Sequence, residues 1–334
     1  MPPDAPRNAR PPWVSLLAVA MLASVGFAVG SAQFLTAFNI YVILSSASLL
    51  AIIGFSQMVV LAVGEISLAV GAIGELAAVV TGHLLVTRGV PLAPALVGGL
   101  AFGTVLGLVN GLLVATTGVG GFVITLATGG ACAGIALAIT ETVPYTGLPA
   151  AFNAFGTGRL GPLPFVLMVA AVAAVALGTL YRWRRTGRAM LAVGGNAEAA
   201  ELSGLSRRRA IVTAHALSGL LASAAGLVAM AQLHEANPNS GTGWLIQSFT
   251  LPVIGGTLLT GGELSVVGIL VAAPILATIN DGLILVNVNP VWITLVQGVL
   301  IFMAMLLGRF RGLDLGRLTG GLLRGRAAPA GGRP

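Results

Sequence analysis

Four carboxylates lie inside or beside long apolar stretches of the chain: Glu65, Glu75, Glu263 and Asp281. A charge inside an apolar membrane helix costs about 3 kcal/mol to insert, so it is usually kept for function or for a polar partner. Glu65 and Glu263 occur in glycine-containing sequences, which predicts solvated turns at a membrane boundary. Glu75 and Asp281 are deeper, and two interpretations stay open: a polar contact inside a helix bundle, or a position along a pathway. Their order along the chain shows no paired acid and base.

The other reactive side chains exclude several kinds of chemistry. All 17 basic residues are arginine, whereas a Walker A loop or a Schiff base requires lysine. Cys132 is the single cysteine, and His83, His215 and His234 have no paired ligand spacing. We therefore expect no catalytic residue, no cofactor and no metal. If ATP drives this protein, a partner must bind the ATP.

The composition indicates a polytopic membrane protein. Of 334 residues, 56% are hydrophobic and 8% are charged, against about 25% charged in ordinary soluble domains. A bilayer crossing needs roughly 20 apolar residues, and such stretches predict an all-α fold of about ten spans, with the short eighth as a possible re-entrant segment. The predicted spans are 13–33, 40–63, 68–87, 92–116, 121–140, 163–181, 211–232, 246–261, 266–286 and 291–308.

The arginines indicate the orientation of these spans. With the N-terminus in the cytoplasm, 15 arginines fall on the cytoplasmic side, and only Arg88 and Arg159 fall on the opposite side. The positive-inside rule therefore favours ten crossings with both ends cytoplasmic. This predicts a cytoplasmic segment 1–12, a transmembrane domain 13–308 and a basic, disordered tail 309–334 that can contact anionic lipid. Because the arginines follow the membrane, we expect no nucleic-acid partner.

Two connections are longer than structural turns require. Residues 182–210 are predicted to face the cytoplasm, and Asn196 is a candidate N-cap for a short helix that carries Glu198 and Glu201 in its first two turns. Residues 141–162 are predicted to face outward, and their glycines, prolines and aromatic residues indicate an ordered loop that meets a partner or covers an entrance.

Small residues recur at helical spacing in two of the spans. Such stripes allow close helix packing, and a surface lining a pore is the alternative interpretation. The stripe in the fourth span comprises Gly99, Gly103, Gly107 and Gly111, and the one in the third span comprises Ser67, Gly71, Gly74 and Ala78. The polar residues predicted to lie in a pathway or within the bundle are Glu65, Ser67, Glu75, Asn110, Thr125, Asn280 and Asp281.

Several strings together resemble one known family. VGEISLAVG at 63–71 resembles that family's GGIDLSVG segment, and AVGGNAEAAELSG at 192–204 resembles its GGNxEAARLSGI segment. Further matches are NGLLV at 110–114, FVITLAT at 122–128, VIGGT with a following GG at 253–262, and NDGL at 280–283. From about residue 40 to 308, the chain resembles the permease subunit of the ribose, xylose and arabinose type of bacterial ABC importer. It departs from the pattern at Glu65, Ser67 and Ala69, where the family commonly has Gly, Asp and Ser.

The resemblance implies partners and a role for the cytoplasmic loop. In such importers two permease chains in the bacterial inner membrane assemble with two ATPase domains, and a periplasmic binding protein delivers the solute. It implies that the solute is a monosaccharide or a sugar-like molecule. It also implies that 196–205 form the coupling helix, with glutamates for charge contacts and alanines for close packing. The implied coupling residues are Gly194, Gly195, Asn196, Glu198, Ala199, Ala200, Glu201 and Gly204.

Two other functions remain open at this stage. A secondary transporter of about ten helices would use an ion gradient through a membrane carboxylate such as Glu75 or Asp281. A passive channel would need neither nucleotide nor gradient. Uphill transport that requires a separate ATPase distinguishes the importer from both.

Overall fold

A computed structural model describes residues 24–289 and, beyond them, 292, 295, 298, 299 and 302. Within this part of the chain, six helices are long and apolar enough to cross a bilayer. They are α2 (Ala37–Leu61), α4 (Leu92–Thr117), α5 (Gly121–Thr140), α7 (Val166–Trp183), α10 (Arg207–Leu233) and α12 (Val266–Leu285). Two shorter apolar helices complete the membrane part, α3 (Val70–Val86) and α11 (Trp244–Ile254).

The predicted spans correspond to these helices, with one correction and two that lie largely outside the described residues. The eighth predicted span, 246–261, is not a complete crossing, because α11 has 11 residues and ends at Ile254. At about 1.5 Å per residue it rises about 16 Å, roughly half of a bilayer core. The predicted tenth span and most of the first lie outside the described residues, as do the segments 1–12 and 309–334.

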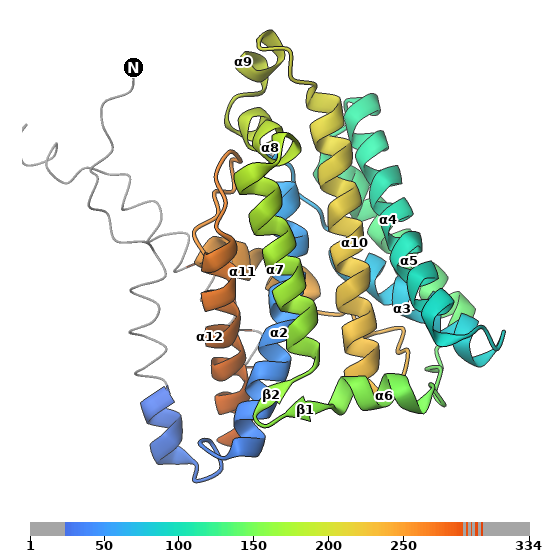
Figure 1. Ribbon diagram of the computed structural model, residues 1–334, viewed down its shortest axis with the longest axis vertical. Helices are drawn as coiled ribbons and strands as arrows, with labels where there is room; N and C mark the ends of the chain where they lie inside the picture. Colours follow the sequence, from blue (N-terminus) through green and yellow to red (C-terminus); the bar gives the residue numbers. More distant parts are fainter. Residues whose placement is uncertain (1–23, 290–291, 293–294, 296–297, 300–301, 303–334) are drawn as a thin grey trace, which may run out of the picture.

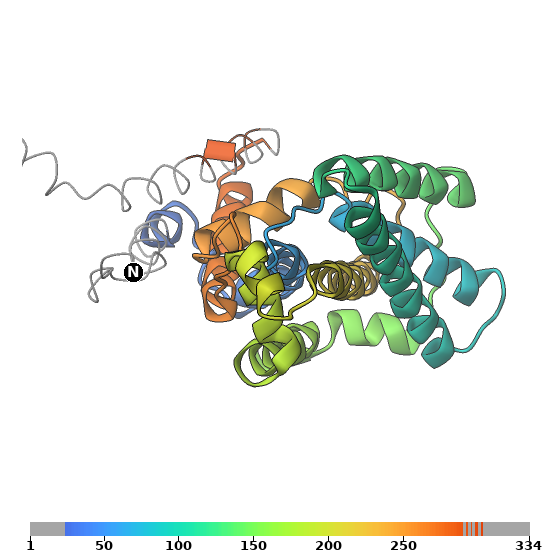
Figure 2. The same ribbon diagram turned by 90° about the horizontal axis from the view of Figure 1, so that it is seen from above.

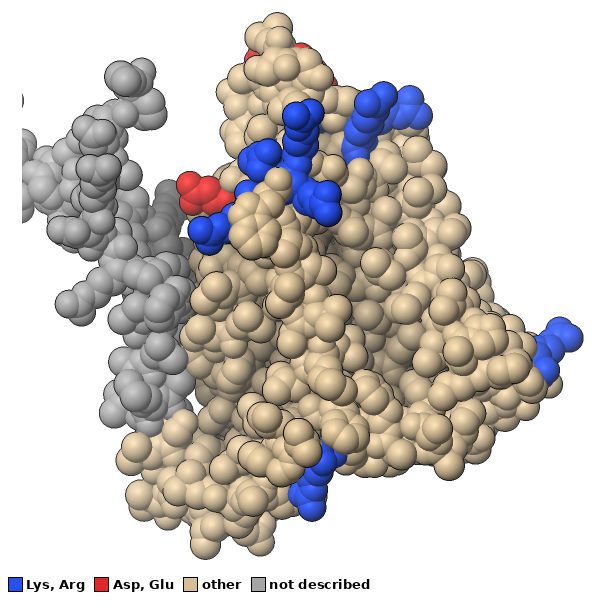
Figure 3. Space-filling view, in the orientation of Figure 1, with Lys and Arg blue, Asp and Glu red and all other residues tan. Residues whose placement is uncertain are grey.

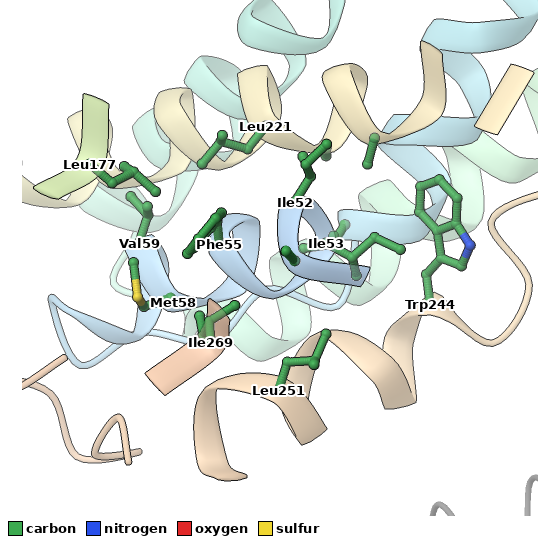
Figure 4. Packing of buried hydrophobic residues seen from close by; sticks show 14 of the residues in the cluster. Ile52, Ile53, Phe55, Met58, Val59, Leu177, Leu221, Trp244, Leu251 and Ile269 are labelled. Carbon is green, nitrogen blue, oxygen red and sulfur yellow. The ribbon is translucent and has the colours of Figure 1, made fainter. Parts of the chain in front are cut away.

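The helix α2 lies at the centre of the bundle. Seen from above, α2 and α10 stand side by side, with α11 and α12 on one flank and α3, α4 and α5 on the other (Figure 2). Ile52, Ile53 and Phe55 of α2 are fully buried, and their neighbours include Trp244 and Leu251 of α11 (Figure 4). The inner half of α2 is enclosed, and its side chains are apolar on every side of the helix except for the buried Ser48, Ser56 and Gln57.

The two ends of the bundle carry different structures (Figure 1). One end carries α8 (Arg185–Gly195) and α9 (Ala197–Leu202), and the other carries α6 (Ala150–Thr157) and the hairpin of β1 (Arg159–Leu160) and β2 (Leu163–Pro164). Basic side chains gather at the first end (Figure 3). We call it the arginine face, after the seven arginines between 182 and 209. We call the opposite end the hairpin face.

Two segments of the chain cross the bundle as a non-helical stretch joined to a short helix, and we call them the broken crossings. The first passes from the arginine face through the non-helical residues 65–69 into α3, which ends near the hairpin face. The second enters from the hairpin face through 234–243 and continues as α11 toward the arginine face. Their helices begin side by side, since a Cβ on Gly71 would lie 3.3 Å from Cβ of Trp244.

Candidate functional site

The predicted coupling helix exists as α9, with Asn196 as its N-cap. The Asn196 side chain accepts a hydrogen bond from the Ala199 N–H at 2.9 Å, which satisfies one of the free donors of the first turn. Glu198, Ala199 and Glu201 are exposed, whereas Ala200 is buried against the rest of the chain. The helix thus turns Ala200 inward and Ala199 outward, and close packing of a partner on these alanines stays a prediction. Leu202 is 86% exposed at the end of α9.

Three glycine-containing segments meet beneath α8 and α9, and we call their meeting point the glycine junction. It consists of the turn 62–64 after α2, Gly194 and Gly195 at the end of α8, and the turn 260–262 before α12. The Gly262 N–H donates a hydrogen bond to the Ala62 carbonyl at 3.2 Å. Gly64, Gly261 and Gly262 have positive φ angles, which L side chains rarely adopt.

Backbone lies directly against backbone in this junction. A Cβ on Gly194 would lie 2.7 Å from the Gly262 nitrogen and would also overlap the Ala62 carbonyl oxygen. A Cβ on Gly261 would lie 2.8 Å from the Gly194 oxygen. Sequence reasoning placed Gly194 and Gly195 in the coupling loop but missed their contact with the other two turns. The only signal in the sequence was a glycine in each of the three segments, and this does not reveal that the segments contact one another.

Glu65 follows the glycine junction and is more enclosed than a solvated turn. Its side chain is 17% exposed and lies 3.7 Å from the Arg207 guanidinium, measured from Oε1 to Nη2. The Gly121 N–H at the start of α5 also donates to the carboxylate. The contrast is Glu263, which is exposed in its turn.

The segment that follows Glu65 is attached to α5 through a predicted polar residue. Thr125 is fully buried, and its hydroxyl oxygen accepts a hydrogen bond from the Leu68 N–H at 3.0 Å while donating to the Gly121 carbonyl. Ser67, which precedes Leu68 in the chain, is also buried. The structure thus brings Glu65, Ser67 and Thr125 together along the non-helical part of the first broken crossing.

The deeper carboxylates have polar partners within the bundle. Glu75, on α3, is 5% exposed and accepts a hydrogen bond from the Gly241 N–H at 3.1 Å. Asp281, on α12, accepts one from the Asn39 amide of α2 at 2.8 Å. Asn280 precedes it on the same helix, and Asn110 is buried on α4. These residues do not converge with Glu65 and Thr125 at one site.

The glycine stripe of α4 faces other helices. All four glycines are buried, Gly99 against Thr81 of α3 and the other three against α10. A Cβ on Gly103 would lie 2.5 Å from Cβ of Ser223, and a Cβ on Gly111 would lie 2.8 Å from Cα of Val212. The stripe therefore sets how closely α4 and α10 approach, as small residues do in membrane helix pairs.

Sequence reasoning missed two buried polar side chains. Gln57 of α2 is fully buried, and neither of its amide atoms has a hydrogen-bond partner among the described residues. His215 of α10 is 1% exposed, and its Nε2 has no partner there either. A glutamine inside an apolar run was the available signal for the first of these.

A family comparison identifies this arrangement. Residues 32–305 match the family described as branched-chain amino acid transport system / permease component. The chain belongs to this permease family. It is therefore a non-catalytic, multi-pass transport component of the bacterial inner membrane. No solved structure matches the permease.

Curated relatives cover most of the permease. It is 35% identical over 281 residues to the ribose import permease protein of Bacillus subtilis, covering 83% of this chain and 86% of that protein. It is 32% identical to the D-allose transport system permease protein of Escherichia coli, with 87% and 89% covered. It is 32% identical to the L-arabinose ABC transporter permease protein of Azospirillum brasilense, with 84% and 82% covered.

Proposed function

We propose that this permease is the membrane subunit of an ATP-driven importer for a monosaccharide or a related sugar-like solute. The three relatives above are named for ribose, allose and arabinose, and each match covers more than four fifths of both chains. The description of the family model names branched-chain amino acids, so the transported solute has to be tested against that class as well.

We propose further that α8 and α9 dock a separate ATPase. The observation that carries this is the placement of α9: a capped helix with exposed acids that projects from the arginine face and is continuous with the glycine junction (Figure 1). The permease has no lysine for a nucleotide site of its own. On this proposal Glu198, Glu201 and Leu202 contact the ATPase, while Gly204, with its positive φ, turns the chain back toward α10.

The orientation follows from the same proposal. The arginine face is cytoplasmic, as the positive-inside rule requires for short loops rich in arginine. The hairpin face is periplasmic, and its α6 and β1–β2 hairpin receive the solute-binding protein. A second permease chain, identical or different, completes the membrane part, and lipid surrounds it.

The competing function is an ion-driven secondary transporter that works through a membrane carboxylate. The partners of Glu75 and Asp281 favour a bundle role for both, because each carboxylate accepts a hydrogen bond that joins two segments of the chain. Family membership also favours the importer. Uphill uptake by the permease alone, in vesicles without ATPase or nucleotide, would reject the proposed function.

One reconstitution experiment tests solute and docking together. Proteoliposomes with the permease, its ATPase and its binding protein should accumulate labelled ribose, allose or arabinose, but not leucine. Accumulation should require ATP on the side of the membrane where the ATPase is bound. Uptake of leucine alone would overturn the sugar assignment. For docking, Glu198→Arg combined with Glu201→Arg should abolish co-purification with the ATPase.

The matched control for docking is Glu263→Arg. It reverses an exposed acid in the α11–α12 turn, near the arginine face but outside α8 and α9. It should leave co-purification unchanged. Equal loss of the ATPase from both variants would show a general charge effect and would reject α9 as the docking element.

A further inference from the structure

The glycine junction connects the end of α8 to both broken crossings. Gly194 lies against the turn 62–64, which leads through residues 65–69 into α3. It also lies against the turn 260–262, which follows α11 after a few residues. One hydrogen bond, from the Gly262 N–H to the Ala62 carbonyl, joins the two turns to each other. A single point of the docking loop thus reaches both discontinuous segments of the membrane domain.

The kind of contact decides what this connection can transmit. Side chains can change rotamers to absorb a small shift, but backbone that touches backbone has no such freedom. Packed protein interiors are also nearly incompressible, so a displacement at one side of such a contact appears at the other. At Gly194 and Gly261, even one added carbon would fall within 2.8 Å of the neighbouring backbone.

Both broken crossings continue from the junction to the same place. The α3 and α11 helices begin beside each other, where Gly71 and Gly74 pack against Trp244. Discontinuous helices that meet inside a membrane commonly form the solute and ion sites of transporters. A shift of the two turns would therefore act on α3 and α11 together.

We propose that the glycine junction is a positioning element that makes α8 and the turns of both broken crossings move as one unit. Gly194 is its central positioning residue. This inference rests on the proposed function, in which an ATPase docked on α8 and α9 supplies the movement. It assigns the glycines a role in coupling, separate from docking and from the stability of the fold.

Two helical glycines provide a matched pair of variants. Gly194 lies at the end of α8 and Gly178 lies on the neighbouring helix α7, so alanine favours the helix at either position. A Cβ on Gly194 would meet the junction backbone, whereas a Cβ on Gly178 would have nothing within 4 Å. Gly194→Ala therefore disturbs the junction, and Gly178→Ala leaves it in place.

The first test measures docking, ATP hydrolysis and uptake for both variants in the complete reconstituted importer. With Gly194→Ala, ATPase co-purification and hydrolysis should stay within about twofold of the unmodified importer, while uptake per ATP falls about tenfold, a typical size for a lost coupling between sites. Gly178→Ala should keep all three. Equal uptake per ATP in the two variants overturns the inference. If the unmodified importer neither binds the ATPase nor takes up sugar, the proposed function fails instead.

A second test leaves the glycines intact and so remains decisive if Gly194→Ala does not fold. In a Cys132→Ala background, spin labels are placed on exposed residues as the pairs Thr186→Cys with Leu258→Cys and Thr186→Cys with Leu160→Cys. Thr186 lies on α8, Leu258 on the turn after α11, and Leu160 on the hairpin. Between nucleotide-free and ATP-bound states of the whole importer, the first distance should stay the same while the second changes. A change in the first, or no change in either, overturns the inference.

Discussion

The two broken crossings have the same parts but are held in different ways. The non-helical part of the first, 65–69, leaves the glycine junction and is attached to α5 by Thr125. The non-helical part of the second, 234–243, pairs with Tyr145 of the loop 141–149 through a two-way bridge at Ala236. It is held further by the Glu75 carboxylate, and by the Asn237 amide, which donates to Glu235.

The membrane domain therefore has a rigid half, toward the arginine face, and an adjustable half, toward the hairpin face. Toward the arginine face, contacts of glycine backbone admit no added carbon at Gly194 and Gly261. Toward the hairpin face, polar side chains hold a partly exposed loop and can exchange partners with water or solute. On the proposed function, the arginine face receives force from the ATPase and the hairpin face receives the solute, so the two halves have different tasks. Variants that weaken each half separately test this distinction.

The largest effect is expected where the two halves meet, at Gly74 of α3. A Cβ there would lie 2.6 Å from the Ala222 carbonyl of α10 and 2.8 Å from the Trp244 ring. Gly74→Ala should therefore lower the free energy of unfolding by about 3 kcal/mol, the upper part of the range for overpacking. A thiol-reactive dye that detects exposure of the buried Cys132 can follow thermal unfolding.

The control for this variant is Gly130→Ala on α5. Both glycines are helical, but a Cβ on Gly130 would have nothing within 4 Å. Gly130→Ala should therefore leave the melting temperature unchanged or raise it slightly. Similar melting of the two variants would mean that the contact between α3, α10 and α11 is looser than described, and the two halves would then be mechanically independent.

Much of this arrangement was accessible from the sequence, and the reasons for the remainder are physical. Hydropathy located the long helices, and Asn196 followed by Glu198 predicted the capped α9, because both signals are local. The depth at which α3 and α11 begin was not predictable, since apolar residues carry no mark of position along the membrane normal. The glycine junction was missed because contact between Gly64, Gly194 and Gly261 depends on tertiary packing. Glu65 was expected in solvent because its partner Arg207 is far away in sequence.

An intermediate effect is expected at Glu75, which holds the adjustable half. Glu75→Ala removes the acceptor of the Gly241 N–H and should cost about 2 kcal/mol of stability, within the range for a buried donor left without a partner. Glu75→Gln keeps an acceptor oxygen and should recover most of that loss. The same dye-based melting measurement in detergent checks both.

Uptake by Glu75→Gln also tests the role of the carboxylate. A residue that only holds the loop should allow ATP-driven uptake close to that of the unmodified permease. A stable Glu75→Gln protein without uptake would show that the acid itself participates in transport. In that case the loop 234–243 would be part of the transport machinery and more than an adjustable support.

The smallest effect is expected at Thr125, whose hydroxyl fastens Leu68, in the non-helical part of the first crossing, to α5. Thr125→Val keeps the shape but leaves the Leu68 N–H without that acceptor, and should cost about 1 kcal/mol. Thr125→Ser retains the hydroxyl and should melt close to the unmodified protein. The loss is smaller than at Glu75 because the junction backbone already holds the first crossing, and Leu68 is only half-buried. If Thr125→Val destabilises more than Glu75→Ala, the first crossing depends on side-chain hydrogen bonds as much as the second, and the distinction between a rigid and an adjustable half does not hold.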